Sequence, residues 1–123
     1  MENIKTSREH YEMLKMQPID LILKADLSFI QGNIIKYISR YKYKNGIEDI
    51  KKCIHYAQIA IEHSNTGPKI RMLNFGYMYA KANELPLMTK KIIIATMQDD
   101  YYHVVKLCFK LIKNEYPNEL ISI

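Results

Sequence analysis

The feature that most constrains the fold is the stretch from Leu27 to Glu62, which holds two helical patterns joined by Asn45-Gly46. In each pattern apolar residues recur every three or four positions, the spacing that places side chains on one face of an α-helix. The two faces consist of Leu27, Ile30, Ile34, Ile38 and Tyr41, and of Ile47, Ile50, Ile54, Ala57 and Ile61. Gly46 suits a left-handed residue that ends the first helix. The stretch therefore predicts a helical hairpin whose apolar sides face a core.

A polar, cationic row occupies the other side of the first helix. It is made of Phe29, Asn33, Lys36 and Arg40. Residues spaced by three and four positions lie on one helix face, so an amide, an ammonium and a guanidinium point the same way. Between Gly32 and Tyr56 six Lys or Arg stand against two acids, a local net charge of +4. This concentration of charge indicates an anionic partner.

The rest of the chain also shows helical periods, which predicts an all-α fold of about five to six helices in one domain over residues 1–123. A linker at residues 64–68 separates a hairpin module, residues 10–62, from a C-terminal extension, residues 69–123. The run Ile92-Ile93-Ile94 suits a strand or a buried helix, and without a partner strand we expect a helix. The other expected helices cover residues 7–16, 18–25, 69–85 and 101–116, the second of them beginning at Pro18.

The last expected helix carries a wide apolar face. It consists of Val104, Val105, Leu107, Cys108, Leu111 and Ile112. This is more aliphatic surface than one short domain needs, so we expect a self-association surface there and a homo-oligomer.

Composition narrows the class of protein. Apolar residues make up 48% of the chain, which argues against disorder. The net charge of +5 allows nucleic-acid binding without favouring it, because duplex-binding proteins concentrate more charge on one face. Neither a signal peptide nor a run of about 18 apolar residues is evident, so we expect a cytoplasmic protein without a membrane span.

Cys53 and Cys108 fall on apolar helix faces, which predicts buried free thiols.

An ordered string of short motifs marks the region from His10 to Glu62. It reads HYEMLKMQPIDLIL, LSF, GN-x-IKY, RY-x-x-KNG, EDIKK and HYA. These motifs resemble a phage family of small proteins of unknown function, some members of which are described as nucleotide kinases that lack a Walker loop. The resemblance implies a phage origin, an infected host cell as the place of action and nucleotide-related chemistry. Cys53 departs from the pattern, where a small residue such as alanine is expected.

The resemblance can be carried over residue by residue. It falls on His10, Tyr11, Gln17, Pro18, Asp20, Gly32, Asn33, Lys36, Tyr37, Arg40, Lys44, Gly46, Glu48, Asp49, Lys52 and Tyr56. Gly32 inside a helix costs about 1 kcal/mol relative to alanine, so either close helix packing or the approach of a ligand requires the missing side chain.

The candidate ligand-binding residues combine phosphate-binding groups with aromatic rings. The principal set is Asn33, Lys36, Tyr37, Arg40, Lys44, Lys52 and Tyr56, and the secondary set is His10, Tyr11, Asp49 and His55. Arg binds phosphate with two parallel hydrogen bonds and Lys as a point charge, while Tyr rings serve stacking and cation–π contacts. The acidic pair Glu48-Asp49 either caps the second hairpin helix, or orders Arg40 or accepts a ribose hydroxyl. A solvated charged face remains the alternative interpretation of the whole row.

Several enzyme classes lack their residues in this sequence. No GxxxxGK[ST] loop, zinc-type Cys/His spacing or nucleophile elbow is present, so we expect no metal site and no resident cofactor. The preferred hypothesis is a non-enzymatic protein that binds a nucleotide, and sequesters a nucleotide or a cyclic nucleotide immune signal. A nucleotide kinase using Mg²⁺ and ATP is the alternative that the resemblance implies. A phage accessory protein that binds a host protein or DNA is the third.

Overall fold

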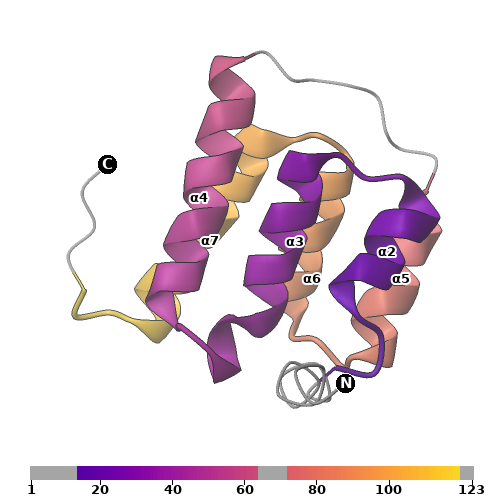
Figure 1. Cartoon of the computed structure of the whole chain (residues 1–123). Coiled ribbons are helices and arrows are strands. Elements are labelled where there is room, and N and C mark those ends of the chain that lie inside the picture. Colours follow the sequence, from indigo (N-terminus) through magenta and orange to yellow (C-terminus); the bar gives the residue numbers. More distant parts are fainter. Residues whose placement is uncertain (1–13, 64–71, 120–123) are drawn as a thin grey trace, which may run out of the picture.

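The helices stack in two layers of three, described over residues 14–63 and 72–119 of this computed structural model (Figure 1). The first layer holds α2 (Pro18–Ala25), α3 (Phe29–Arg40) and α4 (Ile47–Glu62), and the second holds α5 (Leu73–Ala82), α6 (Leu87–Met97) and α7 (Tyr101–Glu115). Each helix of the first layer packs on one of the second: α2 on α5, α3 on α6 and α4 on α7. The described residues contain no strand, which confirms the predicted all-α class.

Local signals in the sequence explain where the first two helices begin. Pro18 opens α2 as expected, and the backbone N–H of Gln17 donates to the Asp20 carboxylate at 3.0 Å. Ser28 caps α3: its Oγ accepts from the N–H of Gln31 at 3.1 Å, while the Gln31 side chain accepts from the N–H of Ser28 at 2.8 Å. This reciprocal pair is a capping box, which satisfies two backbone donors that the first turn leaves open.

The core lies between the two layers and is shared by every helix. The apolar faces predicted for the hairpin point into it, with Ile34, Ile38, Ile50 and Ile54 at most 3% exposed. Helix α6 contacts α3, α5 and α7, so most of its circumference is buried. That position explains the run of three isoleucines, because a helix packed against three others buries a wider apolar face than one that packs on a single neighbour. The expectation of a helix there is confirmed.

The turn of the hairpin differs from the expectation. Helix α3 ends at Arg40 and continues as a short 3-10 turn, Tyr41–Tyr43, before the chain reaches Gly46. Gly46, at φ 55° and ψ −130°, is the residue that precedes α4, and its N–H donates to the carbonyl of Tyr41 at 2.8 Å. The prediction that Gly46 ends the first helix was therefore wrong. Its positive φ instead redirects the chain into the second.

Two other helix boundaries also differ from the predicted ones. Helix α5 ends at Ala82, short of the predicted residue 85, because Glu84 adopts a left-handed conformation at φ 51°. Residues 14–16 are not helical, so the helix expected over residues 7–16 does not extend through its last turn. The remainder of that helix, the linker at residues 64–68 and the predicted start of the 69–85 helix lie outside the described residues.

The apolar face of α7 is already covered within the molecule. Val104, Leu107, Cys108, Leu111 and Ile112 are at most 6% exposed, because α4 and α6 pack against this helix, and Val105 is partly buried against the same core. The argument that this face offers spare surface for self-association was wrong: the face completes the chain's own core. A homo-oligomer stays a prediction without that support.

Gly32 is explained by helix packing. It is buried beneath α2, where a β-carbon would lie 2.9 Å from Cδ1 of Ile22. That is closer than real carbon atoms approach, so the missing side chain leaves room for the Ile22 side chain of α2 to pack on α3. Of the two explanations that the sequence left open, the structure favours close packing.

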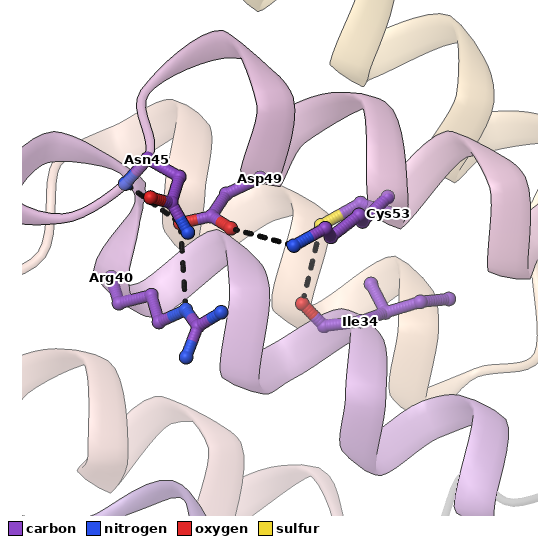
Figure 2. Close-up of polar contacts among 6 residues, drawn as sticks. Ile34, Arg40, Asn45, Asp49 and Cys53 are labelled. Atoms are coloured by element: carbon purple, nitrogen blue, oxygen red, sulfur yellow. Dashed lines mark hydrogen bonds and ion pairs between the residues drawn. The ribbon is translucent and has the colours of Figure 1, made fainter.

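The two cysteines are buried free thiols, as predicted. They come from α4 and α7 and lie next to each other in the core. Burial first of all, and then the neighbouring Cys108 thiol, raise the pKa of Cys53 well above its ordinary value. The Cys53 thiol also donates a weak hydrogen bond to the carbonyl of Ile34, with Sγ 3.4 Å from the oxygen (Figure 2).

Among the described residues, none of the helices is long and apolar enough to cross a bilayer.

Candidate functional site

Three cations surround one tyrosine ring on the hairpin. Lys36 Nζ and Arg40 Cζ each lie 4.6 Å from the centre of the Tyr37 ring, and Lys52 Nζ lies 4.9 Å from it. Lys36 and Arg40 come from α3, whereas Lys52 reaches across from α4. The negative face of an aromatic ring attracts cations, and this attraction gathers the three charges on one side of the hairpin. We call these three cations with Tyr37, Tyr56, Phe29 and Asn33 the hairpin face.

One buried carboxylate supports this arrangement from below. Asp49 is 0% exposed, and its Oδ2 lies 3.4 Å from Nε of Arg40 and accepts from the N–H of Asn45 at 3.2 Å. Its other oxygen, Oδ1, lies 3.9 Å from Nζ of Lys52. Figure 2 shows one terminal nitrogen of Arg40 beside Nε and the other on the side of the guanidinium away from Asp49. The contact with the carboxylate is thus made by Nε, and neither terminal nitrogen of Arg40 forms a hydrogen bond within the described residues.

Asp49 therefore fulfils one of the roles proposed for the acidic pair. It orders Arg40, and it accepts from the backbone N–H of Asn45 in the turn before α4 rather than from a backbone N–H of the helix itself. Its complete burial leaves no surface on which to receive a ribose hydroxyl, so that role is not available to it. The contact with Arg40 is an ion pair rather than an aligned hydrogen bond: within the described residues, Arg40 Nε and Asp49 Oδ1 are buried without a hydrogen-bond partner.

Aromatic rings extend the hairpin face away from the turn. The ring of Tyr56 stacks on Tyr37 with centroids 6.2 Å apart and planes 14° apart, and Phe29 meets Tyr56 edge-on at 6.2 Å. Phe29 is 75% exposed, which is unusual for a large apolar side chain at a helix start. Asn33 lies one turn beyond it, and its side-chain amide donates to the carbonyl of Phe29 at 2.9 Å. The face thus has a cationic end and an aromatic end.

Most of the principal candidates predicted from the sequence come together here. Lys44 does not: it is exposed on the turn, and the structure gives it no contact with the Tyr37 ring. Among the secondary candidates, His55 packs edge-on against Tyr56 at 5.8 Å and Asp49 lies beneath the cations. His10 and Tyr11 lie outside the described residues. Of the cations that the sequence offered on α4, Lys52 joins the face, while Lys51 pairs with Glu48 at 3.4 Å.

Sequence reasoning did not include Phe29 among the candidate residues. Its place in the polar row with Asn33 and Lys36 was the available signal, because an apolar ring on the solvent side of an amphipathic helix has no core to join. The adjacency of Cys53 and Cys108 carried no signal at all, since 55 positions separate them. In the part of the chain that the structure describes, no three His, Cys, Asp or Glu side chains lie close enough together to hold a metal ion.

The comparisons with known proteins concern the first part of the chain. No curated protein and no solved structure matches the chain. Residues 4–58 match the model of a family described as a protein of unknown function, DUF3310. The match takes in α2, α3 and most of α4, and so includes the candidate residues from Asn33 to Tyr56; it ends before α5. The segment that bears the hairpin face is therefore similar to this family of unknown function.

Proposed function

We propose that the protein binds a nucleotide on the hairpin face, with phosphates at the cationic end and the base at the aromatic end. The observation that carries the proposal is the convergence of Lys36, Arg40 and Lys52 within 5 Å of one tyrosine ring. Phosphate is the biological anion that such a group of ammonium and guanidinium ions suits best.

Charge balance supports an anionic ligand. Asp49 supplies one negative charge beneath the three cations, which leaves an excess of two positive charges. Lys36 has no ion pair among the described residues, and the side chain of Lys52 is 46% exposed. Like charges held this close repel one another, and a bound phosphate would offset that repulsion. The terminal nitrogens of Arg40 would supply two parallel hydrogen bonds.

The aromatic end supports a base as the other part of the ligand. Phe29 presents an exposed ring beside the stacked pair Tyr37 and Tyr56. Stacking of a nucleobase on an aromatic ring contributes about 1–3 kcal/mol and tolerates any base. A ligand with both a flat ring and phosphates matches the two ends of the face, and mono-, di- and cyclic nucleotides share this chemistry.

Capture without turnover is the form of the proposal that we prefer. Transfer of a phosphoryl group calls for groups that position the metal and the acceptor. The carboxylate at the hairpin face, Asp49, is buried and engaged with Arg40 and Asn45. We infer that the protein holds its ligand unchanged, as a protein that sequesters a nucleotide or a cyclic nucleotide signal would.

A ligand screen tests the proposal. The purified protein is heated in the presence of nucleoside mono-, di- and triphosphates and cyclic di- and trinucleotides, with and without Mg²⁺, and the recovered ligand is analysed by mass spectrometry. A ligand at 100 times its dissociation constant adds about 2.7 kcal/mol to the free energy of unfolding. For a domain of this size that is a rise of several degrees in Tm. We expect this rise to be lost in Lys36→Ala and Lys52→Ala.

The matched control is Lys81→Ala, which removes an exposed lysine of α5 outside the hairpin face. It should retain the full shift. Recovery of a new phosphorylated product would replace capture by the kinase alternative. The absence of any shift, or equal shifts in all three variants, would reject the hairpin face as a nucleotide site.

A further inference from the structure

A second basic surface lies in the other layer of the molecule. It is a groove of about 560 Å³ between α6 and α7, with α5 at its edge. Its lining consists of Tyr77, Leu87, Lys90, Lys91, Ile94, Ala95, Gln98, His103, Lys106, Leu107 and Lys110. None of these residues comes from the hairpin, and all lie beyond residue 58, where the family match ends.

The rims of the groove are cationic on both sides. Lys90 and Lys91 stand on α6, while Lys106 and Lys110, one turn apart, stand on α7. No Asp or Glu occurs among the described residues that line it, and none of the four lysines forms an ion pair within the described part of the chain. A concave surface lined by one sign of charge focuses the potential and attracts the opposite sign.

The floor of the groove is aliphatic. It is made of Ile94 together with Ala95 and Leu107, of which only 2% and 6% is exposed, and at the mouth Leu87 is 61% exposed and Tyr77 49% exposed. Exposed apolar residues grouped in a concavity indicate a contact surface rather than a solvated face. An occupant would have to present apolar groups to the floor and negative charges to both rims.

We propose that this groove binds an acidic amphipathic segment of a partner protein. A helix that places apolar side chains at i, i+3, i+4 and i+7 lies with one stripe in an apolar groove. Asp or Glu side chains flanking that stripe would then meet Lys90 and Lys91 on one rim and Lys106 and Lys110 on the other. The complementary charges favour this register and exclude basic segments.

A nucleic acid fits the groove less well. Its phosphates could reach the lysines, but single strands also need aromatic rings for their bases. Tyr77 is the one aromatic side chain of the lining apart from the imidazole of His103, and it stands at the edge with Lys90 Nζ 5.9 Å from its ring. The aliphatic floor would remain without a partner. The groove therefore differs in kind from the hairpin face, where rings and cations alternate.

The test uses a fluorescein-labelled peptide with Leu at i, i+3, i+4 and i+7 and Glu at the remaining positions, and measures binding to the full chain by fluorescence anisotropy. We expect saturable binding that weakens at least tenfold in the double variant Lys106→Glu/Lys110→Glu. The matched control, Lys113→Glu, reverses an exposed charge of α7 outside the groove and should weaken binding less than twofold. These three lysines are exposed, and circular dichroism verifies the fold of each variant.

Two further arms decide the nature of the site. A peptide that keeps Glu but carries Ser in place of Leu should bind at least tenfold more weakly, and equal binding would overturn the proposal by showing mere charge attraction. Tighter binding of an oligothymidylate than of the peptide would overturn it in favour of a nucleic-acid groove. Lys42→Glu, an exposed charge reversal in the 3-10 turn of the hairpin, should leave peptide binding unchanged. The groove shares no residue with the hairpin face, so the result is independent of the nucleotide proposal.

Discussion

Arg40 and Asp49 meet across the turn of the hairpin, with Nε 3.4 Å from Oδ2, and the Asp49 side chain is fully buried while the Arg40 side chain is 19% exposed. They come from different helices, so this pair fixes the end of α3 against the start of α4. It also determines how the cations above it are directed. The structure and the proposed binding of phosphate thus depend on the same contact.

Asp49→Asn should destabilise the fold. The change keeps the shape of the side chain but removes the charge that balances Arg40 and Lys52, and it weakens the acceptor for the N–H of Asn45. We expect a loss on the order of 2 kcal/mol in the free energy of unfolding, measured by urea denaturation. Glu48→Gln, at an exposed neighbouring acid, is the control and should cost less than about 0.5 kcal/mol. Equal losses would show that the buried pair contributes nothing beyond local helix effects.

Arg40→Lys should separate charge from geometry in the proposed nucleotide site. Lysine keeps the positive charge but has a single nitrogen. It cannot contact Asp49 through one nitrogen and donate two parallel hydrogen bonds to a ligand through two others. We expect a tenfold or greater rise in the Kd of whichever nucleotide stabilises the wild-type protein, measured by isothermal titration calorimetry. The same exchange in reverse at an exposed position of the 3-10 turn, Lys42→Arg, should change the Kd less than twofold. An Arg40→Lys protein with wild-type affinity would mean that the terminal nitrogens of Arg40 do not contact the ligand.

Gly46→Ala should destabilise the hairpin turn. The backbone at φ 55° and ψ −130° is strained for any residue with a side chain, and a β-carbon would lie 3.1 Å from the hydroxyl oxygen of Tyr116. We expect a loss of about 1–3 kcal/mol, measured by the fall in Tm and in the urea midpoint. Lys42→Ala, in the adjoining 3-10 turn, controls for alanine substitution near the turn. A neutral Gly46→Ala would indicate that the turn relaxes to another conformation at little cost.

Both thiols should be unreactive in the native protein. Cys53 and Cys108 are buried, and the raised pKa of Cys53 disfavours the reactive thiolate. We expect iodoacetamide at pH 8 to modify neither cysteine until urea unfolds the chain, after which both react, as counted by intact mass. Rapid modification of the folded protein would show that α4 and α7 separate readily.

Stability should fall in alkali. Burial raises the pKa of Cys53 and of Tyr41, Tyr79 and Tyr101 above their ordinary values of 9.0 and 10.0. The folded state therefore keeps protons that the unfolded chain releases, so stability is complete below about pH 9 and declines above it. Each group contributes up to about 1.4 kcal/mol per pH unit.

Urea denaturation at pH 7, 9, 10 and 10.5 measures this decline. Tyr79→Phe, which removes a buried hydroxyl that donates to Ser39 at 2.7 Å, should make it shallower. Tyr102→Phe removes a hydroxyl from an exposed side chain and controls for the substitution itself. A free energy of unfolding that stays level to pH 10.5 would contradict the burial of these groups.

The hairpin could be derived from sequence because its determinants are local. Helical period, Pro18 and the Asn45-Gly46 turn act over a few residues, and these signals placed α2, α3 and α4 within a few positions of their observed bounds. The row of Asn33, Lys36 and Arg40 follows from the same periodicity. The end of α5 was expected at residue 85, just before Pro86, which cannot continue a helix. The helix ends earlier, at Ala82, because Glu84 is left-handed.

Only the tertiary structure decided what each helix face meets. The sequence suggested that the apolar face of α7 was spare surface, but α4 and α6 cover it. The sequence also allowed Asp49 to be a simple helix cap, but its side chain is buried beneath Arg40 and Lys52. The groove between α6 and α7 has no sequence signature. Its lysines look like ordinary solvent-exposed residues in the sequence, and only the packing of the two helices brings them to one concave surface. Periodicity within a helix is a local property of the chain, whereas burial, charge pairing and concavity depend on which distant segment arrives next to it.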